Sequence, residues 1–142
     1  MATINDIADA VVSELNAGHF STSIEASRCY RPRYELEELD ELHVSVIPAG
    51  GRQEAASRGD DVHTDRVQVG VQQRVREPGP GELDPLIDLV EEIQGHFKGW
   101  SVPGTGAHCT TVSVDPLFSP DHLARQHVFT SVLTLEFTRW SF

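Results

Sequence analysis

Residues 66–75 read RVQVGVQQRV, and valines in this stretch alternate with polar residues or glycine, Gln73 being the exception. Because successive side chains of a strand point to opposite faces, the alternation predicts a strand with one buried and one polar face. Residues 42–46 and 129–137 repeat the pattern. Three such segments predict a mostly antiparallel sheet with one covered face. The apolar positions that define this face are Leu42, Val44, Val46, Val67, Val69, Val71, Val75, Phe129, Leu133, Leu135 and Phe137.

Two stretches have the apolar spacing of amphipathic helices. In the first, residues 4–16, apolar side chains recur at the spacing of helical turns. The second follows Asp84 and Pro85, a pair typical of a helix N-cap and the first helical residue. Gly95 and Gly99 mark its end. We expect both helices to lie on the covered face of the sheet.

The remaining segments complete one domain, residues 1–142. β-branched and aromatic residues predict strands around 22–28, 110–114 and 126–140, in addition to residues 42–47 and 66–75. Ser119 and Pro120 predict a helical turn through Leu123. The fold class expected is α+β: a mostly antiparallel sheet of four to five strands, with two main helices packed on one face.

Residues 50–61, GGRQEAASRGDD, have no apolar periodicity, yet they join two strands that should pair. A connection of this length exceeds a tight hairpin, and long connections are often functional or mobile. We therefore expect this stretch to form a projecting hairpin arm or a long loop.

The charge balance excludes some functions. The chain has 22 acidic against 11 basic residues and a net charge of -11, which argues against a protein that grips nucleic-acid phosphates. No apolar run reaches the length of a membrane helix, and acidic residues near the N-terminus do not suit a signal peptide. We expect synthesis in the cytoplasm, with Cys29 and Cys109 reduced and buried.

No catalytic, metal-binding or cofactor-binding motif is visible. The seven histidines lack zinc-site spacing, and His108 and Cys109 are adjacent strand residues whose side chains point to opposite faces. We expect no enzymatic activity and no cofactor. An acidic run is compatible with paired carboxylates for acid-base catalysis, with binding of a divalent cation, or with a solvated surface. Its members are Glu35, Glu37, Glu38, Asp40 and Glu41.

Taken in order, the segments resemble the tail-terminator family of tailed bacteriophages, also called neck or tail-completion proteins. The likeness covers nearly the whole chain. It is carried by an amphipathic N-terminal helix and by four phrases: YRPRYELEEL (30–39), HVSVIPAG (43–50), LDPLIDLVEEIQGHF (83–97) and HVFTSVLTLEF (127–137).

The resemblance implies a virion structural protein that is made in the bacterial host cytoplasm. Its subunits would form a homohexameric ring on the head-proximal end of the tail tube, stop tube polymerisation and dock the head connector. DNA would pass through the central hole without sequence-specific binding, which a negative charge favours.

A closed ring needs heterologous contacts between different patches of neighbouring subunits. The arm supplies candidate interface residues, and the acidic run supplies a candidate lumen or connector-facing surface. The interface residues nominated are Arg52, Glu54, Arg58, Asp60 and Asp61.

Two alternative functions are also compatible with the sequence. One is a head-closure or connector-adaptor protein of the neck. The other is a small enzyme or ligand-binding domain with a pocket near Trp100, His108 and Cys109.

Overall fold

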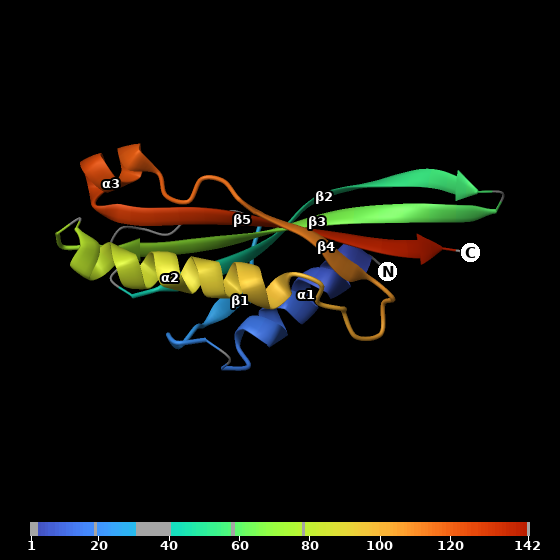
Figure 1. Cartoon of the computed structure of the whole chain (residues 1–142), viewed down its shortest axis with the longest axis horizontal. Helices are drawn as coiled ribbons and strands as arrows, with labels where there is room; N and C mark the ends of the chain where they lie inside the picture. Colours follow the sequence, from blue (N-terminus) through green and yellow to red (C-terminus); the bar gives the residue numbers. More distant parts are fainter. Residues whose placement is uncertain (1–2, 19, 31–40, 58, 78, 142) are drawn as a thin grey trace.

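The computed structural model describes residues 3–18, 20–30, 41–57, 59–77 and 79–141. It is an α+β fold in which three helices accompany a five-stranded sheet of order β1-β2-β3-β5-β4 (Figure 1). Every strand pair is antiparallel except β1 with β2, so the expected fold class is confirmed. The elements are α1 (Thr3–Leu15), β1 (Ala26–Arg28), β2 (His43–Ser57), β3 (Asp60–Arg74), α2 (Pro80–Phe97), β4 (His108–Val114), α3 (Pro120–Gln126) and β5 (Val128–Ser141).

The valine strand lies at the centre of the sheet. In β3, Val67, Val69 and Val71 are completely buried. The register places Val67 opposite Leu135 and Val69 opposite Leu133 of β5, so the apolar positions of both strands share one face. Alternation along the sequence therefore predicted the core side of these strands correctly.

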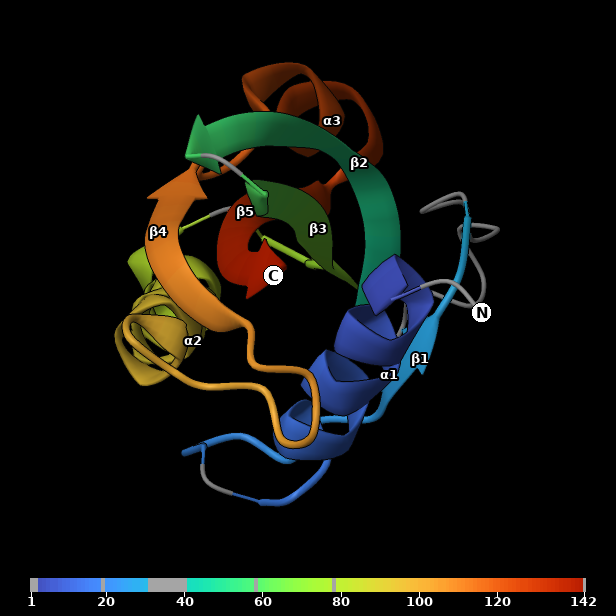
Figure 2. The same cartoon turned by 90° about the vertical axis from the view of Figure 1, so that its right-hand side faces the viewer.

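Helices α1 and α2 pack on this core face, and α3 lies on the opposite side of β3 and β5 (Figure 2). The buried residues of α1 are Ile7, Ala8, Val11 and Leu15, and those of α2 are Leu86, Leu89, Val90, Ile93 and Phe97. Burial of these stripes provides most of the driving force for the two-layer packing.

Helix α3 is longer than the single turn expected after Ser119. The Ser119 hydroxyl accepts a hydrogen bond from the His122 N–H at 3.4 Å, which caps the helix start. The His122 ring Nδ1 lies 3.1 Å from the Thr130 hydroxyl of β5. This contact fixes α3 on the polar face of the sheet.

The start of α2 differs from the expectation. The helix begins at Pro80 after Gly79, and Pro85 lies inside it. Proline is favoured as the first residue of a helix. In α2 that residue is Pro80 and not Pro85. The Glu82 carboxylate then accepts the backbone N–H groups of Arg76 and Glu77, each at 3.0 Å. These bonds hold the incoming chain against the first turn, which explains why the helix starts earlier than predicted.

Strand β1 is shorter than the predicted 22–28 and pairs parallel to β2. Asn16, just after α1, binds the backbone of Ala26 twice. Its amide Nδ2 donates to the Ala26 carbonyl at 3.1 Å, and its Oδ1 accepts the Ala26 N–H at 2.7 Å. The Asn16 side chain thus satisfies the backbone hydrogen-bonding groups of Ala26 in β1 and links the end of α1 to the edge of the sheet.

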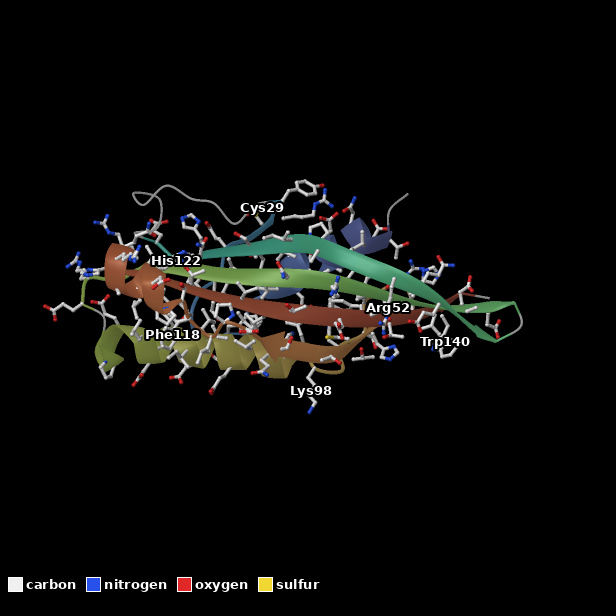
Figure 3. All side chains as sticks on the ribbon, turned by 90° about the horizontal axis from the view of Figure 1, so that it is seen from above. Cys29, Arg52, Lys98, Phe118, His122 and Trp140 are labelled. Carbon is white, nitrogen blue, oxygen red and sulfur yellow. The ribbon has the colours of Figure 1, made fainter. Side chains whose placement is uncertain are left out.

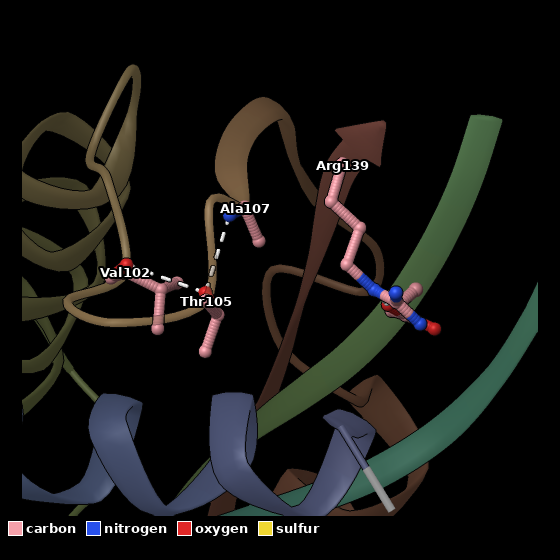
Figure 4. A network of polar contacts seen from close by, with 5 residues as sticks. Val102, Thr105, Ala107 and Arg139 are labelled. Carbon is pink, nitrogen blue, oxygen red and sulfur yellow. Dashed lines mark hydrogen bonds and ion pairs between the residues drawn. The ribbon is translucent and has the colours of Figure 1, made fainter. Parts of the chain in front are cut away.

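The loop before β4 is closed by Thr105 (Figure 4). Its hydroxyl donates to the Val102 carbonyl at 3.2 Å and accepts the Ala107 N–H at 3.1 Å. Val102 and Ala107 are buried, so this loop forms part of the boundary of the core.

Candidate assembly surface

The stretch 50–61 belongs to a long hydrogen-bonded hairpin. Strands β2 and β3 pair from His43 opposite Gln72 to Ser57 opposite Asp60, with irregularities between Pro48 and Gly50 and near the tip. Strand β5 continues beside β3 as far as Ser141.

We define the arm as residues 52–57, 60–64 and 138–141. It extends beyond the ends of α1 and α2 (Figure 1). At about 3.3 Å per residue, the β2 part of the arm spans roughly 20 Å. The arm is therefore a three-stranded extension of the sheet that leaves the helix-covered core.

Polar side chains pair along both faces of the arm. On one face Arg52 and Glu54 form an exposed ion pair, with Nε and Oε1 separated by 3.5 Å. On the other face the Gln53 side chain donates to the Asp61 carboxylate at 2.8 Å. Exposed pairs of this kind add little stability, so they leave the charged groups available to a partner.

An exposed tryptophan lies at the end of the arm. The register puts Trp140 beside Val62 and on the same face as Arg52, and Figure 3 shows Arg52 and Trp140 at the same end of the molecule. The Trp140 residue is 53% exposed. Tryptophan and arginine are the residues most enriched among the strongest contributors to protein interfaces.

At the base of the arm, the sheet face opposite α1 and α2 contains a hollow of about 150 Å³. We call this face the open face. Arg66 lies directly opposite Glu136 in the β3–β5 register. A side chain at Gly50 would place its Cβ only 3.1 Å from Arg66 Nη2, so glycine lets the Arg66 guanidinium lie against β2. The hollow is lined by Gly51, Arg52, Thr64, Arg66 and Glu136.

The helix layer is acidic. The segments Thr3–Leu15 and Pro80–Phe97 contain three and five acidic residues respectively, and neither contains lysine or arginine. Asp84, Asp88 and Glu91 are exposed on α2. Their spacing of four and then three residues puts them on one side of the helix. We call these three residues the acidic stripe.

The structure brings some of the predicted interface residues together and separates others. Arg52 and Glu54 share the open face, whereas Asp61 is on the other face with Gln53. Asp60 lies at the tip opposite Ser57. Arg58 is outside the described residues.

Most of the acidic run is also outside the described residues, namely Glu35, Glu37, Glu38 and Asp40; Glu41 is described and exposed. Sequence reasoning overlooked Trp140 and the Arg66–Glu136 pair. The available signal was the alternation of side chains along each strand. Arg66, Glu136 and Trp140 all occupy positions that alternate with the buried ones.

The region near Trp100 has the character of core. The Trp100 ring packs edge-on against Phe97, with ring centroids 5.1 Å apart, and against Phe137 at 6.3 Å. Burial raises the pKa of the Cys109 thiol to about 11, which keeps it protonated and unreactive at neutral pH. His108 is exposed, whereas Cys109 is buried. This environment does not suit a cysteine nucleophile.

Within the described ranges, no group of three or more His, Cys, Asp or Glu side chains is arranged to hold a metal ion. None of the helices in those ranges combines the length and apolar character needed to cross a membrane. No protein-family model matches the chain, and no curated protein matches it in sequence.

Proposed function

We propose that this chain is a virion structural protein, a tail terminator that forms a homohexameric ring at the head-proximal end of a phage tail tube. The ring stops tube polymerisation and offers a docking surface to the head connector, and DNA passes through its centre. The role is structural and requires no catalysis or cofactor. The observation that carries the proposal is the arm, a three-stranded extension of the sheet beyond the helix layer.

The edge of β2 supports a role in contacts between chains. In the described part of the chain, β1 pairs with β2 only at residues 44–46, so the outer edge of β2 continues past β1 towards the arm tip. Exposed strand edges accept strands or loops from other chains. Pro48, the neighbouring irregularity and the charged Arg52 and Glu54 limit indiscriminate pairing along this edge.

Trp140 supports the same conclusion from side-chain chemistry. A large aromatic residue on a projecting arm gains most when a partner covers it. Its exposure at 53% contrasts with the burial of Phe129 and Phe137 in the same strand. We infer that Trp140 anchors the arm on a neighbouring subunit or on the last layer of the tube.

The overall charge suits a ring around DNA. A net charge of -11 per chain becomes a strongly negative field when copies are assembled in a circle. Phosphates then slide through the hole without being held, because tight phosphate binding requires clustered basic groups.

The test is a capping assay with purified chain and polymerised tail tubes. The parent chain should form a ring, measured by native mass across a range of concentrations and by negative-stain images, and it should stop tube growth. Trp140→Ser should abolish capping with a change in unfolding free energy within about 0.5 kcal/mol, since Trp140 lies outside the core. Tyr30→Ser is the matched control, because Tyr30 is 69% exposed but lies outside the arm.

A parent chain that stays monomeric and leaves tubes growing would reject the terminator role. Capping by Trp140→Ser at the parent level would reject the role of the arm. A tagged chain recovered with tail-less heads instead of head-less tails would favour the connector-adaptor alternative.

A further inference from the structure

The hollow and the acidic stripe lie on opposite sides of the sheet. The register puts the side chains that line the hollow on the face away from α1 and α2, and the stripe is on the exposed side of α2. They cannot meet within one molecule. We propose that the hollow of one subunit binds the acidic stripe of α2 from the next copy of the chain. This contact rests on the ring proposed above.

The chemistry of the hollow favours a carboxylate. Arg52 and Arg66 supply two guanidinium groups to the lining, against the single carboxylate of Glu136 opposite Arg66. Arg52 also forms the exposed ion pair with Glu54, a weak contact that a carboxylate of a partner can replace. A guanidinium binds a carboxylate through two parallel hydrogen bonds, a strong and directional interaction. The volume of about 150 Å³ is on the scale of a single acidic side chain.

The spacings of the two charged surfaces are of similar size. In the sheet register Arg52 lies opposite Thr64, two residues from Arg66 on the neighbouring strand. Two residues along a strand and one strand across correspond to roughly 8 Å between Cα atoms. On α2, Asp88 lies one turn, roughly 6 Å, from Asp84, and Asp84 and Glu91 are about 10 Å apart along the axis. Two acidic residues of the stripe can therefore face two arginines.

The stripe itself favours a basic partner. Like charges four residues apart on a helix repel one another and destabilise it by about 0.2–0.5 kcal/mol. A neighbouring subunit that brings arginines to Asp84 and Asp88 converts this repulsion into attraction. Arg52 and Arg66 of this chain lie on its open face. A second copy of the chain is therefore a complementary partner for the stripe.

The placement of the two surfaces also sets the symmetry. A contact between different patches on opposite sides of each subunit is heterologous, and heterologous contacts repeat from copy to copy until they close a ring. A two-fold dimer would instead bring the same patch together with itself. The charge distribution thus favours a head-to-tail assembly.

A charge-swap experiment tests the contact. Arg52→Glu/Arg66→Glu reverses the hollow, and Asp84→Lys/Asp88→Lys reverses the stripe. Each double variant alone should lose the ring, with association weakened at least about 30-fold. An equimolar mixture of the two should restore the ring, with the two variants in alternating positions. At every second interface the reversed hollow of one variant faces the reversed stripe of the other, so Glu meets Lys. At the remaining interfaces the unchanged hollow faces the unchanged stripe.

The controls separate assembly from folding. Arg66→Glu alone should weaken the ring, whereas Arg125→Glu, the same charge change on exposed α3, should not. Circular dichroism and thermal unfolding establish that each variant is folded. Rescue by mixing provides a second check, since a misfolded variant cannot be rescued by a folded partner.

The outcomes distinguish this contact from the ring itself. A parent ring together with intact rings of both double variants, or folded variants that fail to assemble when mixed, would overturn the contact and leave the proposed ring standing. A parent chain without any ring, even on tube ends, would reject both. Variants that keep the ring but no longer bind tubes would assign the hollow to the tube protein and overturn the contact.

Discussion

Asp65 and Arg139 form an ion pair on the core face of the sheet, with Oδ2 and Nε separated by 3.3 Å, where the hydrophobic core gives way to the arm. Asp65 lies opposite the buried Phe137 in the register and is itself only 9% exposed. The pair therefore joins β3 to β5 at the boundary between the helix-covered sheet and its extension.

Removing the arginine should destabilise the fold. Arg139→Met leaves the Asp65 carboxylate in a largely buried position without its ion-pair partner, and we expect a loss of about 1–3 kcal/mol in the free energy of unfolding. Urea denaturation measures it. The double variant Asp65→Asn/Arg139→Met should recover part of the loss, since it removes the buried charge. Equal stability of Arg139→Met and the parent would show that the pair contributes nothing.

Two glycines should respond in opposite directions to alanine. A Cβ at Gly51 would lie 2.9 Å from the Asp65 carboxylate and 3.1 Å from the Thr64 carbonyl oxygen, so Gly51→Ala should destabilise by about 1–2 kcal/mol. Gly95 is exposed within α2 and has open space around it. Gly95→Ala should stabilise by about 0.5–1 kcal/mol. Thermal unfolding of the two variants compares them directly, and a stabilising Gly51→Ala would contradict the close packing of β2 on β3.

Glu82 should make stability depend on pH. Hydrogen bonds from the backbone N–H groups of Glu77 and Arg76 lower the pKa of its carboxyl below the ordinary 4.5. The associated stabilisation is complete above the unfolded pKa and is lost as pH falls through the lower folded pKa. Glu82→Gln should therefore reduce the melting temperature at pH 7, with the difference from the parent shrinking below pH 4.

The control for this variant is Asp84→Asn, which removes one negative charge two residues along the same helix. It should not reproduce the pH dependence, because the backbone of residues 76 and 77 binds Glu82. A constant difference between Glu82→Gln and the parent from pH 7 to pH 3 would argue that the charge is not involved.

The two cysteines should react differently with a thiol reagent. Burial raises the pKa of Cys109 to about 11, so about one molecule in a thousand carries the thiolate at pH 8. Cys29 is only partly buried, so the expectation of a buried thiol was wrong for this cysteine. Native protein should show one rapidly labelled thiol, Cys29→Ser should show none, and denaturation should expose both sites in the parent. Rapid labelling of Cys29→Ser would place Cys109 in contact with solvent.

Local patterns were sufficient for much of the fold. The alternation in residues 66–75 correctly predicted which side of β3 is buried, and the apolar spacing in residues 4–16 predicted α1 to within one residue at each end. The strand signal repeats every two residues and the helix signal repeats every turn. Both are therefore visible in a short stretch of sequence. The predicted start of α2 was wrong by five residues because Pro80 and Pro85 carry the same local signal.

The candidate site was much less predictable. The stretch 50–61 lacks apolar alternation, so the sequence left both a projecting hairpin arm and a long loop open. Its residues form strands because β3 bonds to β2 and, far along the chain, to β5. No local pattern records that pairing.

The sequence by itself determined the α+β composition, the buried side of the central strands and the excess of acidic charge. Only the tertiary structure decided that Arg52 and Arg66 line one hollow with Glu136, and that Trp140 projects beside Val62. The physical reason is that a strand's faces follow from its own period, whereas its register with a distant strand depends on packing across the whole sheet.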